Sequence, residues 1–222
     1  MRLADARVLI FARAPRLGEV KTRLIPVLGA AGACALHAAC LRSTLQRLGR
    51  TGMPPLELWL DADSDDPDLH ALAARYSCDI HLQQGGDLGQ RMAQAARQAL
   101  MRAGAVILVG TDVPLLDAAY VRQAMGRLGE GADVVMGPAD DGGYVLLGLR
   151  QVYAELFEDM PWGSDAVARL TRERCARLDL DLRELPSRWD LDRPADLQRL
   201  CSLDDVALRE LQLLLRQHLP RL

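Results

Sequence analysis

Short apolar segments that alternate with amphipathic helical segments limit this chain to an α/β architecture. The clearest segment, 105–110 (AVILVG), has no polar side chain, which is typical of a strand buried on both faces of a sheet. Further strands are expected at 7–14, 56–60, 78–83, 132–137 and 144–149. Apolar residues at helical spacing occupy 34–48, 87–103, 164–177 and 194–218. The alternation predicts a mostly parallel central sheet with helices on both faces.

Two local signals indicate where helices begin. Pro114 is expected to open the helix after the 105–110 strand. Ser202, with Asp205 three residues later, resembles a capping box, so the last helix is expected to restart there. In that helix one apolar face is formed by Leu208, Leu211 and Leu215. This face would suit a homodimer, although packing against the rest of the same chain explains it more simply.

Composition excludes several classes of protein. The 222 residues contain no linker rich in Pro, Gly or Ser and no repeat, so we expect one domain over 1–222. The net charge of −3 and nine scattered aromatic residues argue against a nucleic-acid partner. Five cysteines form no CxxC pair, and the N-terminus lacks a signal peptide. No stretch approaches the roughly 20 apolar residues of a membrane span. We therefore expect a cytoplasmic protein with reduced thiols and no membrane partner.

The common catalytic signatures are missing. The sequence lacks the P-loop pattern GxxxxGK[ST], a GxGxxG after the first strand, GxSxG and HExxH. Its four histidines are isolated, and no Cys/His spacing suits zinc. Ligands of open α/β sheets bind at the carboxyl ends of the strands. The residues that directly follow strands are therefore the ones to examine.

The loop after the first strand, 12–24, is basic although the chain is acidic. Its four cations against one acid are Arg13, Arg16, Lys21 and Arg23 against Glu19. Lys21 is the only lysine among 27 basic residues. A cationic loop in which Gly18 permits a close turn can wrap a phosphate chain. We favour phosphate binding; the alternative is a solvated loop whose charges pair with surface acids.

Aspartates follow two other segments. Asp112 comes directly after the 105–110 strand, and Asp190 and Asp192 lie two apart in WDLDRP, so an extended backbone would point both to one side. The alternative is that Asp112 and Asp192 cap helices near the following prolines. A hard cation such as Mg²⁺ takes one or two carboxylates plus phosphate oxygens and waters. Together the loop and these carboxylates would suit nucleotide phosphates held through a metal.

A third segment, PADDGGYVLLGL at 138–149, brings Asp140 and Asp141 to the pair Gly142 and Gly143. Two adjacent glycines are typical of a tight turn or of a close approach by a ligand. A plain hairpin turn between two strands explains the segment equally well.

Six motifs in order resemble a known family: FARAPRLGEVKTRL, GGDLGQRM, GTDVPLL, GPADDGGYVLLGL, MPWGSDAV and DLDRPADL, spanning residues 11–197. The set resembles a bacterial family of glycosyltransferase-A-like (GT-A-like) proteins. That family is similar to 2-phospholactate guanylyltransferase and, more distantly, to molybdenum-cofactor guanylyltransferase. The resemblance implies a nucleotide-diphospho-sugar transferase fold and a transferase that uses Mg²⁺ or Mn²⁺, a nucleoside triphosphate or nucleotide-sugar, and a small-molecule acceptor.

The resemblance also implies roles for individual residues. The nucleotide would be bound by Ala12, Arg13, Gly18, Lys21, Arg23, Asp87, Leu88, Gly89 and Arg91. The metal ligands would be Asp112 and Asp192, with Asp190 as a further candidate. The acceptor would face Asp140, Asp141, Gly142, Gly143, Tyr144, Trp162 and Ser164. Two positions depart from the family pattern: Arg13 replaces the usual Lys, and Arg193 replaces the usual Thr beside Asp192.

Two reactions suit these residues. In nucleotidyl transfer, an acceptor phosphate attacks the α-phosphorus of a triphosphate, and Lys21, Arg23 and a metal on Asp112 stabilise the charge. In glycosyl transfer, an acceptor hydroxyl attacks the anomeric carbon, and Asp141 is the candidate base. The cationic loop slightly favours nucleotidyl transfer to a small phosphorylated acceptor, whereas the family's usual label favours glycosyl transfer. A non-catalytic nucleotide-binding module on the same fold is the third alternative.

Overall fold

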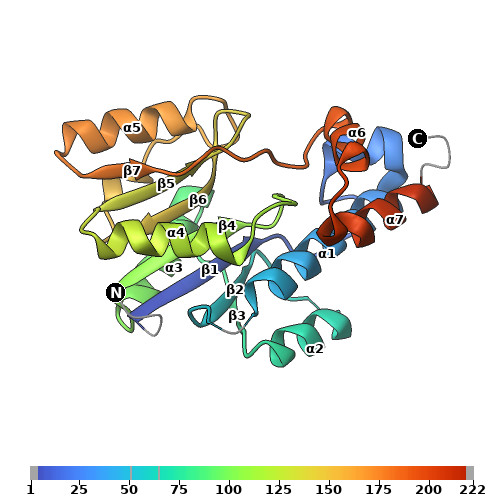
Figure 1. The fold of residues 1–222 in the computed structure, drawn as a ribbon, viewed down its shortest axis with the longest axis horizontal. Helices are drawn as coiled ribbons and strands as arrows, with labels where there is room; N and C mark the ends of the chain where they lie inside the picture. Colours follow the sequence, from blue (N-terminus) through green and yellow to red (C-terminus); the bar gives the residue numbers. More distant parts are fainter. Residues whose placement is uncertain (1–4, 51, 65, 219–222) are drawn as a thin grey trace.

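A central sheet organises the computed structural model, which describes residues 5–50, 52–64 and 66–218 (Figure 1). Within these residues the sheet has the strand order β3-β2-β1-β4-β6-β5-β7. The strands are β1 (Ala6–Ala12), β2 (Leu56–Leu60), β3 (Asp79–Leu82), β4 (Ala105–Gly110), β5 (Val134–Pro138), β6 (Tyr144–Leu149) and β7 (Leu182–Glu184). Only β6 runs antiparallel to its neighbours, β4 and β5, among the described strands. The predicted mostly parallel sheet is confirmed.

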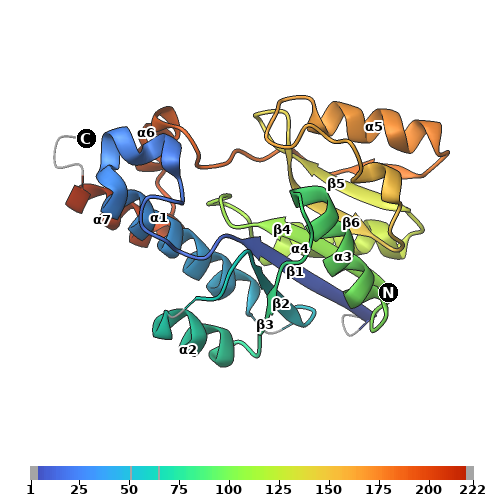
Figure 2. The same cartoon turned by 180° about the vertical axis from the view of Figure 1, so that it is seen from behind.

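Helices cover both faces of the sheet, as predicted. On one face α1 (Ile25–Leu48), α2 (Pro67–Arg75) and α4 (Ala118–Gly129) pack over the strands. On the other face lie α3 (Leu88–Leu100) and α5 (Val167–Arg177). Figure 1 shows α4 in front of the sheet, and the reverse view in Figure 2 shows α3 there. Continuously apolar strands such as β4 are needed because both faces are covered.

A third apolar cluster is formed by helices that lie beside the sheet in Figure 1. It joins the first half of α1 to α6 (Pro194–Ser202) and α7 (Arg209–His218). Leu208, Leu211 and Leu215 are buried in this cluster, so their apolar face packs within the chain, as the simpler of the two explanations held. The cluster also includes Trp189 and Leu191 and therefore anchors the segment that carries Asp190 and Asp192.

Several local predictions were wrong. Helix α2, whose N-cap Asp66 accepts hydrogen bonds from the amides of Asp68 and Leu69, was not predicted, and neither was the short strand β7. Pro114 does not open α4, because the N-cap of that helix is Asp117. Ser202 ends α6, and its hydroxyl donates to the carbonyl of Arg199. Helical structure resumes after it, at the short 3-10 helix Val206–Leu208.

The expectation about membrane-length segments also needs correction. The helix over Thr22–Leu48 is long and apolar enough to cross a membrane by length and composition, with a hydropathy of 1.9 in its most apolar window. Half of that window is buried within the fold. Leu41, Leu45 and Leu48 pack into the core under the sheet, and Leu36 and Ala39 pack in the third cluster. A core helix with two buried faces passes the same test of length and composition.

The carboxyl ends of β1, β2, β4 and β5 point to the same edge of the sheet. After β7 the chain crosses this edge toward α6. Backbone amides along the crossing segment donate to other strand ends: Leu185 to Met136 (2.9 Å), Arg188 to Pro138 (3.0 Å) and Leu191 to Asp112 (2.7 Å). The crossing segment therefore brings residues near 190 to the loop that follows β4.

Candidate active site

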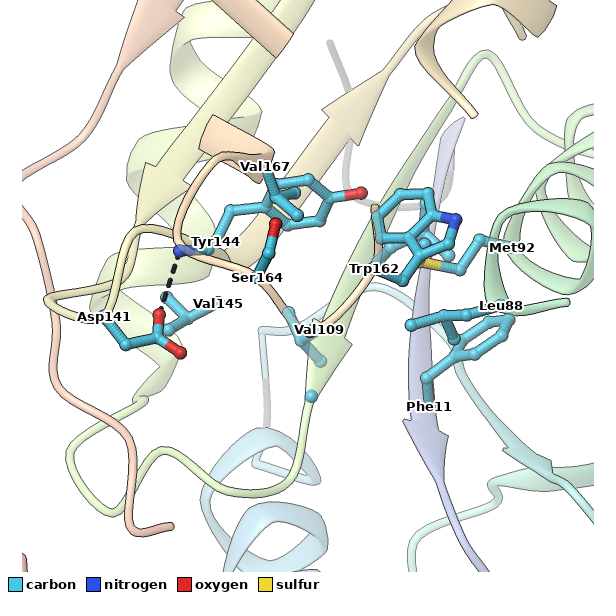
Figure 3. Close-up of a pocket in the computed structure, with 14 residues that line it drawn as sticks. Phe11, Leu88, Met92, Val109, Asp141, Tyr144, Val145, Trp162, Ser164 and Val167 are labelled. Carbon is cyan, nitrogen blue, oxygen red and sulfur yellow. Dashed lines mark hydrogen bonds between the residues drawn. The ribbon is translucent and has the colours of Figure 1, made fainter. Parts of the chain in front are cut away.

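A cleft with two adjoining halves opens at this edge of the sheet. The charged pocket, about 520 Å³, is lined by the first loop, the strand ends of β1, β2 and β4, and Asp192. The aromatic pocket, about 270 Å³, is lined by fourteen residues from β1, α3, β4, β6 and the segment around Trp162 (Figure 3). The two pockets share Phe11, Leu88 and Gly110, so they adjoin each other.

Lys21 is the buried cation of the charged pocket. Its side chain is 2% exposed, and its ammonium donates to Oδ1 of Asp112 (2.7 Å) and to the carbonyl of Leu191 (2.6 Å). Its backbone has φ 43° and ψ 44°, a left-handed conformation that non-glycine residues seldom adopt. Burial lowers the pKa of Lys21, but Asp112 outweighs it and the pKa is raised overall. The only lysine of the chain is thus a buried cation that ties two chain segments together.

Asp112 is more accessible than its partner, since 44% of its side chain is exposed. Burial raises the pKa of this carboxyl, but the charge of Lys21 and the hydrogen bond that it donates act in the opposite direction, and the pKa lies below its usual range. Asp117, not Asp112, caps α4, which contradicts the capping alternative for Asp112. The result is an ionised carboxylate at the end of β4 that solvent and ligands can reach.

Arg23 and Asp192 form a second ion pair across the cleft. The hydrogen bond to Asp192, and then its charge, raise the pKa of Arg23, and Asp141 and Asp190 contribute further. The N-cap position of α6 belongs to Arg193, and the carboxylate of Asp196 accepts from the amides of Asp192 (3.0 Å) and Arg193 (2.6 Å). Asp192 therefore does not cap α6, and its carboxylate faces the charged pocket.

The carboxylates of Asp112 and Asp192 are the candidate ligands for a divalent cation. Both line the charged pocket, and the bond from the Leu191 amide to the Asp112 carbonyl (2.7 Å) keeps their segments together. Among the described residues, no group of three or more His, Cys, Asp or Glu could hold a metal ion. Two carboxylates would have to be completed by phosphate oxygens and waters, which is the coordination that Mg²⁺ accepts.

Asp190 lies apart from that pair. It lines a small acidic pocket with Asp140, Asp141 and Asp192, but it does not line the charged pocket. Burial, and then the charge of Asp141, raise the pKa of Asp190 to about 6. Because Asp112 and Asp192 line the charged pocket and Asp190 does not, the geometry favours the first two as candidate metal ligands.

Arg13 pairs with Asp61, a residue to which the sequence analysis gave no role. Its Nε lies 3.2 Å from Oδ2 of Asp61, and its Nη1 donates to the carbonyl of Glu19 (2.7 Å). Oδ1 of Asp61 accepts from the amide of Ala14 (2.8 Å). Asp61 directly follows β2, so the strand-end rule that identified Asp112 would have found it too. His37 and Gln83 also line the pocket and were missed.

The charged residues that line the pocket give it a net positive charge. Its lining includes four cations and three carboxylates: Arg13, Lys21, Arg23 and Arg91 against Asp61, Asp112 and Asp192. Burial lowers the pKa of His37, so that imidazole adds no charge at neutral pH. A single positive charge is therefore in excess. Arg16 lies outside the lining, and its guanidinium reaches the carbonyl of Asp63 at 3.4 Å.

The segment GGDLGQRM contributes only partly to the cleft. Leu88 lines both pockets, and Arg91 lines the charged one. Asp87 instead caps α3 by accepting from the amide of Gln90 (2.8 Å), and it lines a separate pocket. Gly89 is buried where a Cβ would lie 2.3 Å from the Phe157 carbonyl oxygen, so it sets how closely α3 packs. In the first loop Ala12 lines the charged pocket, whereas Gly18, at φ 79°, lines neither.

The aromatic pocket contains most of the predicted acceptor residues. Asp141, Gly143, Tyr144, Trp162 and Ser164 line it. In Figure 3, Asp141 lies at the opposite end from Phe11, Leu88 and Met92. The rings of Tyr144 and Trp162 meet edge to face with centroids 6.2 Å apart. The hydroxyl of Tyr144 is buried and has no hydrogen-bond partner among the described residues.

Two predicted acceptor residues, Asp140 and Gly142, do not line this pocket but lie in the turn beside it. Asp140 lies outside the pocket and pairs with Arg199 (3.1 Å) and Ser187 (3.0 Å). Gly142 has φ 92°, and a Cβ there would lie 2.3 Å from the carbonyl oxygen of Asp165. The turn that joins β5 to β6 is thus a hairpin turn, as one alternative held, and it also presents Asp141 to the cleft.

The sequence and the fold were compared with known proteins. Residues 44–164 match a family described as uncharacterized protein conserved in bacteria (DUF2064), and no curated protein matches. A protein from Desulfovibrio desulfuricans G20, provisionally described as a nucleotide-diphospho-sugar transferase, is 30% identical with a TM-score of 0.82, covering 97% of this chain and 98% of that one.

More distant structures share the fold. A cytidylyltransferase from Leptospira borgpetersenii serovar Hardjo-bovis is 14% identical with a TM-score of 0.59, over 96% of this chain and 94% of that one. Glucosyl-3-phosphoglycerate synthase from Mycobacterium tuberculosis, solved with Mn²⁺, UDP and glucosyl-3-phosphoglycerate, is 15% identical with a TM-score of 0.53, over 97% and 80%. The chain therefore has the nucleotide-diphospho-sugar transferase fold and belongs to the DUF2064 family of uncharacterised proteins conserved in bacteria.

Proposed function

We propose that the protein is a metal-dependent transferase that takes a group from a nucleotide-activated donor. One observation carries this proposal: buried Lys21 joins Asp112 to the segment of Asp192, so that both carboxylates line a pocket with a net positive charge. Cations beside carboxylates that can share a metal suit a diphosphate or triphosphate. The provisional description of the 30% identical protein points the same way.

The residues of the charged pocket would bind and orient the donor. Arg13, Arg23 and Arg91 are placed to donate charge-assisted hydrogen bonds to phosphate oxygens, and Lys21 keeps the two carboxylates in position. Mg²⁺ or Mn²⁺ held by Asp112 and Asp192 would neutralise charge that develops on the leaving phosphate. Arg23 and Asp192 would exchange their mutual ion pair for contacts with the donor.

The geometry favours glycosyl transfer from a nucleotide-sugar. Three of the four loop cations already pair with carboxylates, which weakens the argument from the loop for a triphosphate. Asp141 lines the neighbouring pocket, where a base is needed. The acceptor O–H would give its proton to the Asp141 carboxylate while its oxygen bonds to the anomeric carbon. The bond from that carbon to the phosphate oxygen breaks, and a nucleoside diphosphate leaves.

Nucleotidyl transfer is the second candidate. The loop carries four cations in thirteen residues, 12–24, and the fold is shared with a cytidylyltransferase. In this reaction an acceptor phosphate would attack the α-phosphorus, and pyrophosphate would leave. The resemblance to guanylyltransferases, noted from the motifs, belongs with this candidate.

A thermal-shift screen tests the proposal. The purified protein is mixed with UDP-glucose, GDP-mannose, CTP, GTP and ATP, each with Mg²⁺, Mn²⁺ or EDTA. A donor at about 100 times its Kd should raise Tm by about 5–10 °C, and EDTA should abolish most of the shift. Arg23→Ala should weaken the shift, whereas Arg177→Ala, an exposed arginine at the end of α5, should not.

The outcomes separate the candidates. A metal-dependent shift with a nucleotide-sugar supports glycosyl transfer, and one confined to a triphosphate moves the preference to nucleotidyl transfer. A shift that ignores metal, without turnover of any donor, would instead identify a non-catalytic nucleotide-binding module. No shift with any of these nucleotides would contradict the proposed function.

A further inference from the structure

The charge of the aromatic pocket constrains what can enter it. Of its fourteen lining residues, Asp141 is the only one with a charged side chain. The neighbouring acidic pocket adds Asp140, Asp190 and Asp192 on the side of Asp141. Its two arginines are Arg193 and Arg199, and Arg199 bonds Asp140 and stacks over Trp189. Among the fourteen residues that line the aromatic pocket, a phosphate or carboxylate would therefore meet one carboxylate and no cation.

The shape of the pocket sets a second condition. Its apolar end is built from Phe11, Leu88, Met92 and Trp162, which Figure 3 shows away from Asp141. Near the other end are the carboxylate of Asp141 and the hydroxyl of Ser164. Oδ1 of Asp141 accepts from the amide of Gly143 (2.9 Å), which fixes the carboxylate at that end. The pocket is thus apolar along most of its wall and has hydrogen-bonding groups at one end.

We infer that the acceptor is an alcohol or phenol with an apolar body and with no phosphate or carboxylate on the part that enters the aromatic pocket. This inference rests on the proposed transferase function, because it assigns the second substrate of the same cleft. The apolar body lies against Trp162, Phe11 and Met92, and the hydroxyl lies near Asp141. Anionic groups are directed to the charged pocket, which has the positive charge.

The inference separates this chain from transferases whose acceptor carries phosphate. The sequence alone slightly favoured nucleotidyl transfer to a small phosphorylated acceptor, because the cationic loop at 12–24 suits a triphosphate. In the structure all cations of the cleft belong to the charged pocket, where the donor phosphates compete for them. The single excess positive charge there leaves little attraction for a second phosphorylated substrate.

Fluorinated probes test the inference directly. Binding of 4-fluorobenzyl alcohol, 4-fluorobenzoate and 4-fluorophenyl phosphate is measured by ¹⁹F NMR titration, in the presence of saturating pyrophosphate and Mg²⁺ to occupy the charged pocket. The alcohol should bind, and the two anions should bind about tenfold more weakly or worse, given the cost of placing like charges together. Trp162→Ala should weaken binding of the alcohol, and Trp162→Phe should retain most of it.

A second variant keeps the test independent of any folding defect in Trp162→Ala. Asp141 is exposed, and Asp141→Asn keeps an oxygen for the Gly143 amide while removing the charge. In this variant the preference for the alcohol over the two anions should shrink by about tenfold. An unchanged preference would mean that Asp141 does not set the selectivity, and the inference would fail.

The remaining outcomes also decide the question. Trp162-dependent binding of the phosphate or benzoate as strong as that of the alcohol would overturn the inference, as would binding of no probe. The nucleotide screen on the same protein separates the two proposals. A nucleotide shift with an anion-preferring pocket refutes only the acceptor class, whereas alcohol binding without any nucleotide shift refutes only the transferase function.

Discussion

The two halves of the cleft are built in opposite ways. The charged pocket holds its residues by ion pairs between distant segments, such as Lys21 with Asp112 and Arg23 with Asp192. The aromatic pocket holds its residues by close packing, as where Gly89 meets Phe157 and Trp162. One half is therefore sensitive to removal of a charge, and the other to addition of a single methyl group. The predictions below test this contrast.

The largest effect is expected on activity in the charged pocket. Lys21→Met and Asp112→Ala should each lower donor turnover by about 10²–10³-fold, because Asp112→Ala removes a proposed metal ligand and Lys21→Met removes the cation that positions Asp112. Release of the nucleoside diphosphate or pyrophosphate from the donor found by the screen measures this. Arg177→Ala serves as the control. A fully active Asp112→Ala protein would refute the metal assignment.

The same two variants should differ in stability. Asp112→Ala leaves the ammonium of Lys21, 2% exposed, without its carboxylate, and stranding a buried charge costs about 3 kcal/mol. Lys21→Met strands Asp112, whose side chain is 44% exposed, so water can replace the lost partner at a cost of about 1 kcal/mol. Urea unfolding gives both values. Equal decreases in the free energy of unfolding of the two variants would mean that Lys21 is less buried than its contacts indicate.

Gly89→Ala probes the packed half. Its Cβ would lie 2.3 Å from the Phe157 carbonyl oxygen, and such overpacking costs about 2 kcal/mol. Gly126→Ala in α4 is the matched control, because its Cβ meets nothing within 4 Å and alanine should add up to about 1 kcal/mol of helix stability. Thermal melts of the pair should move in opposite directions. A neutral Gly89→Ala protein would contradict the close packing of α3 on the Trp162 segment.

The smallest perturbation is chemical labelling of the thiols. Burial raises the pKa of Cys40, on α1, and of Cys175, on α5, to about 11 in each case. Both should therefore resist iodoacetamide at pH 8, while exposed Cys201 reacts. Peptide mass spectrometry of labelled native protein checks this, with protein labelled in urea as the control. Rapid labelling of Cys40 in the native protein would mean that this part of α1 is not stably packed against the rest of the protein.

Much of the fold followed from the sequence because its signals are local. The run AVILVG became β4, and the spacing at 87–103 became α3 with only its ends shifted. The strand-end rule also identified Asp112, which lines the charged pocket. The short strand β7 and the helix α2 were missed because three residues carry almost no periodic pattern and acidic residues obscured a short amphipathic face.

The candidate site was predicted less completely. Asp87 and Gly89 belong to a matching motif, but one caps a helix and the other sets a packing distance. A motif indicates which residue type occupies a position, but it does not indicate whether that residue contacts a ligand. His37 lies on a helix face that only tertiary packing turns toward the first loop, where its Nε2 lies 2.9 Å from the Arg13 carbonyl oxygen.

By itself the sequence determined the kind of sheet, the presence of a cationic loop and the carboxylates at strand ends, since each depends on residues close together in the chain. Tertiary structure decided which charges neutralise one another. Lys21 and Asp112 are 91 residues apart, and Arg23 and Asp192 are 169 apart. The strength of a charge interaction depends on the distance between the charges and on their burial. For residues so far apart in sequence, neither quantity can be read from the local sequence. The division of the cleft into a charged and an aromatic half is therefore a property of the folded chain.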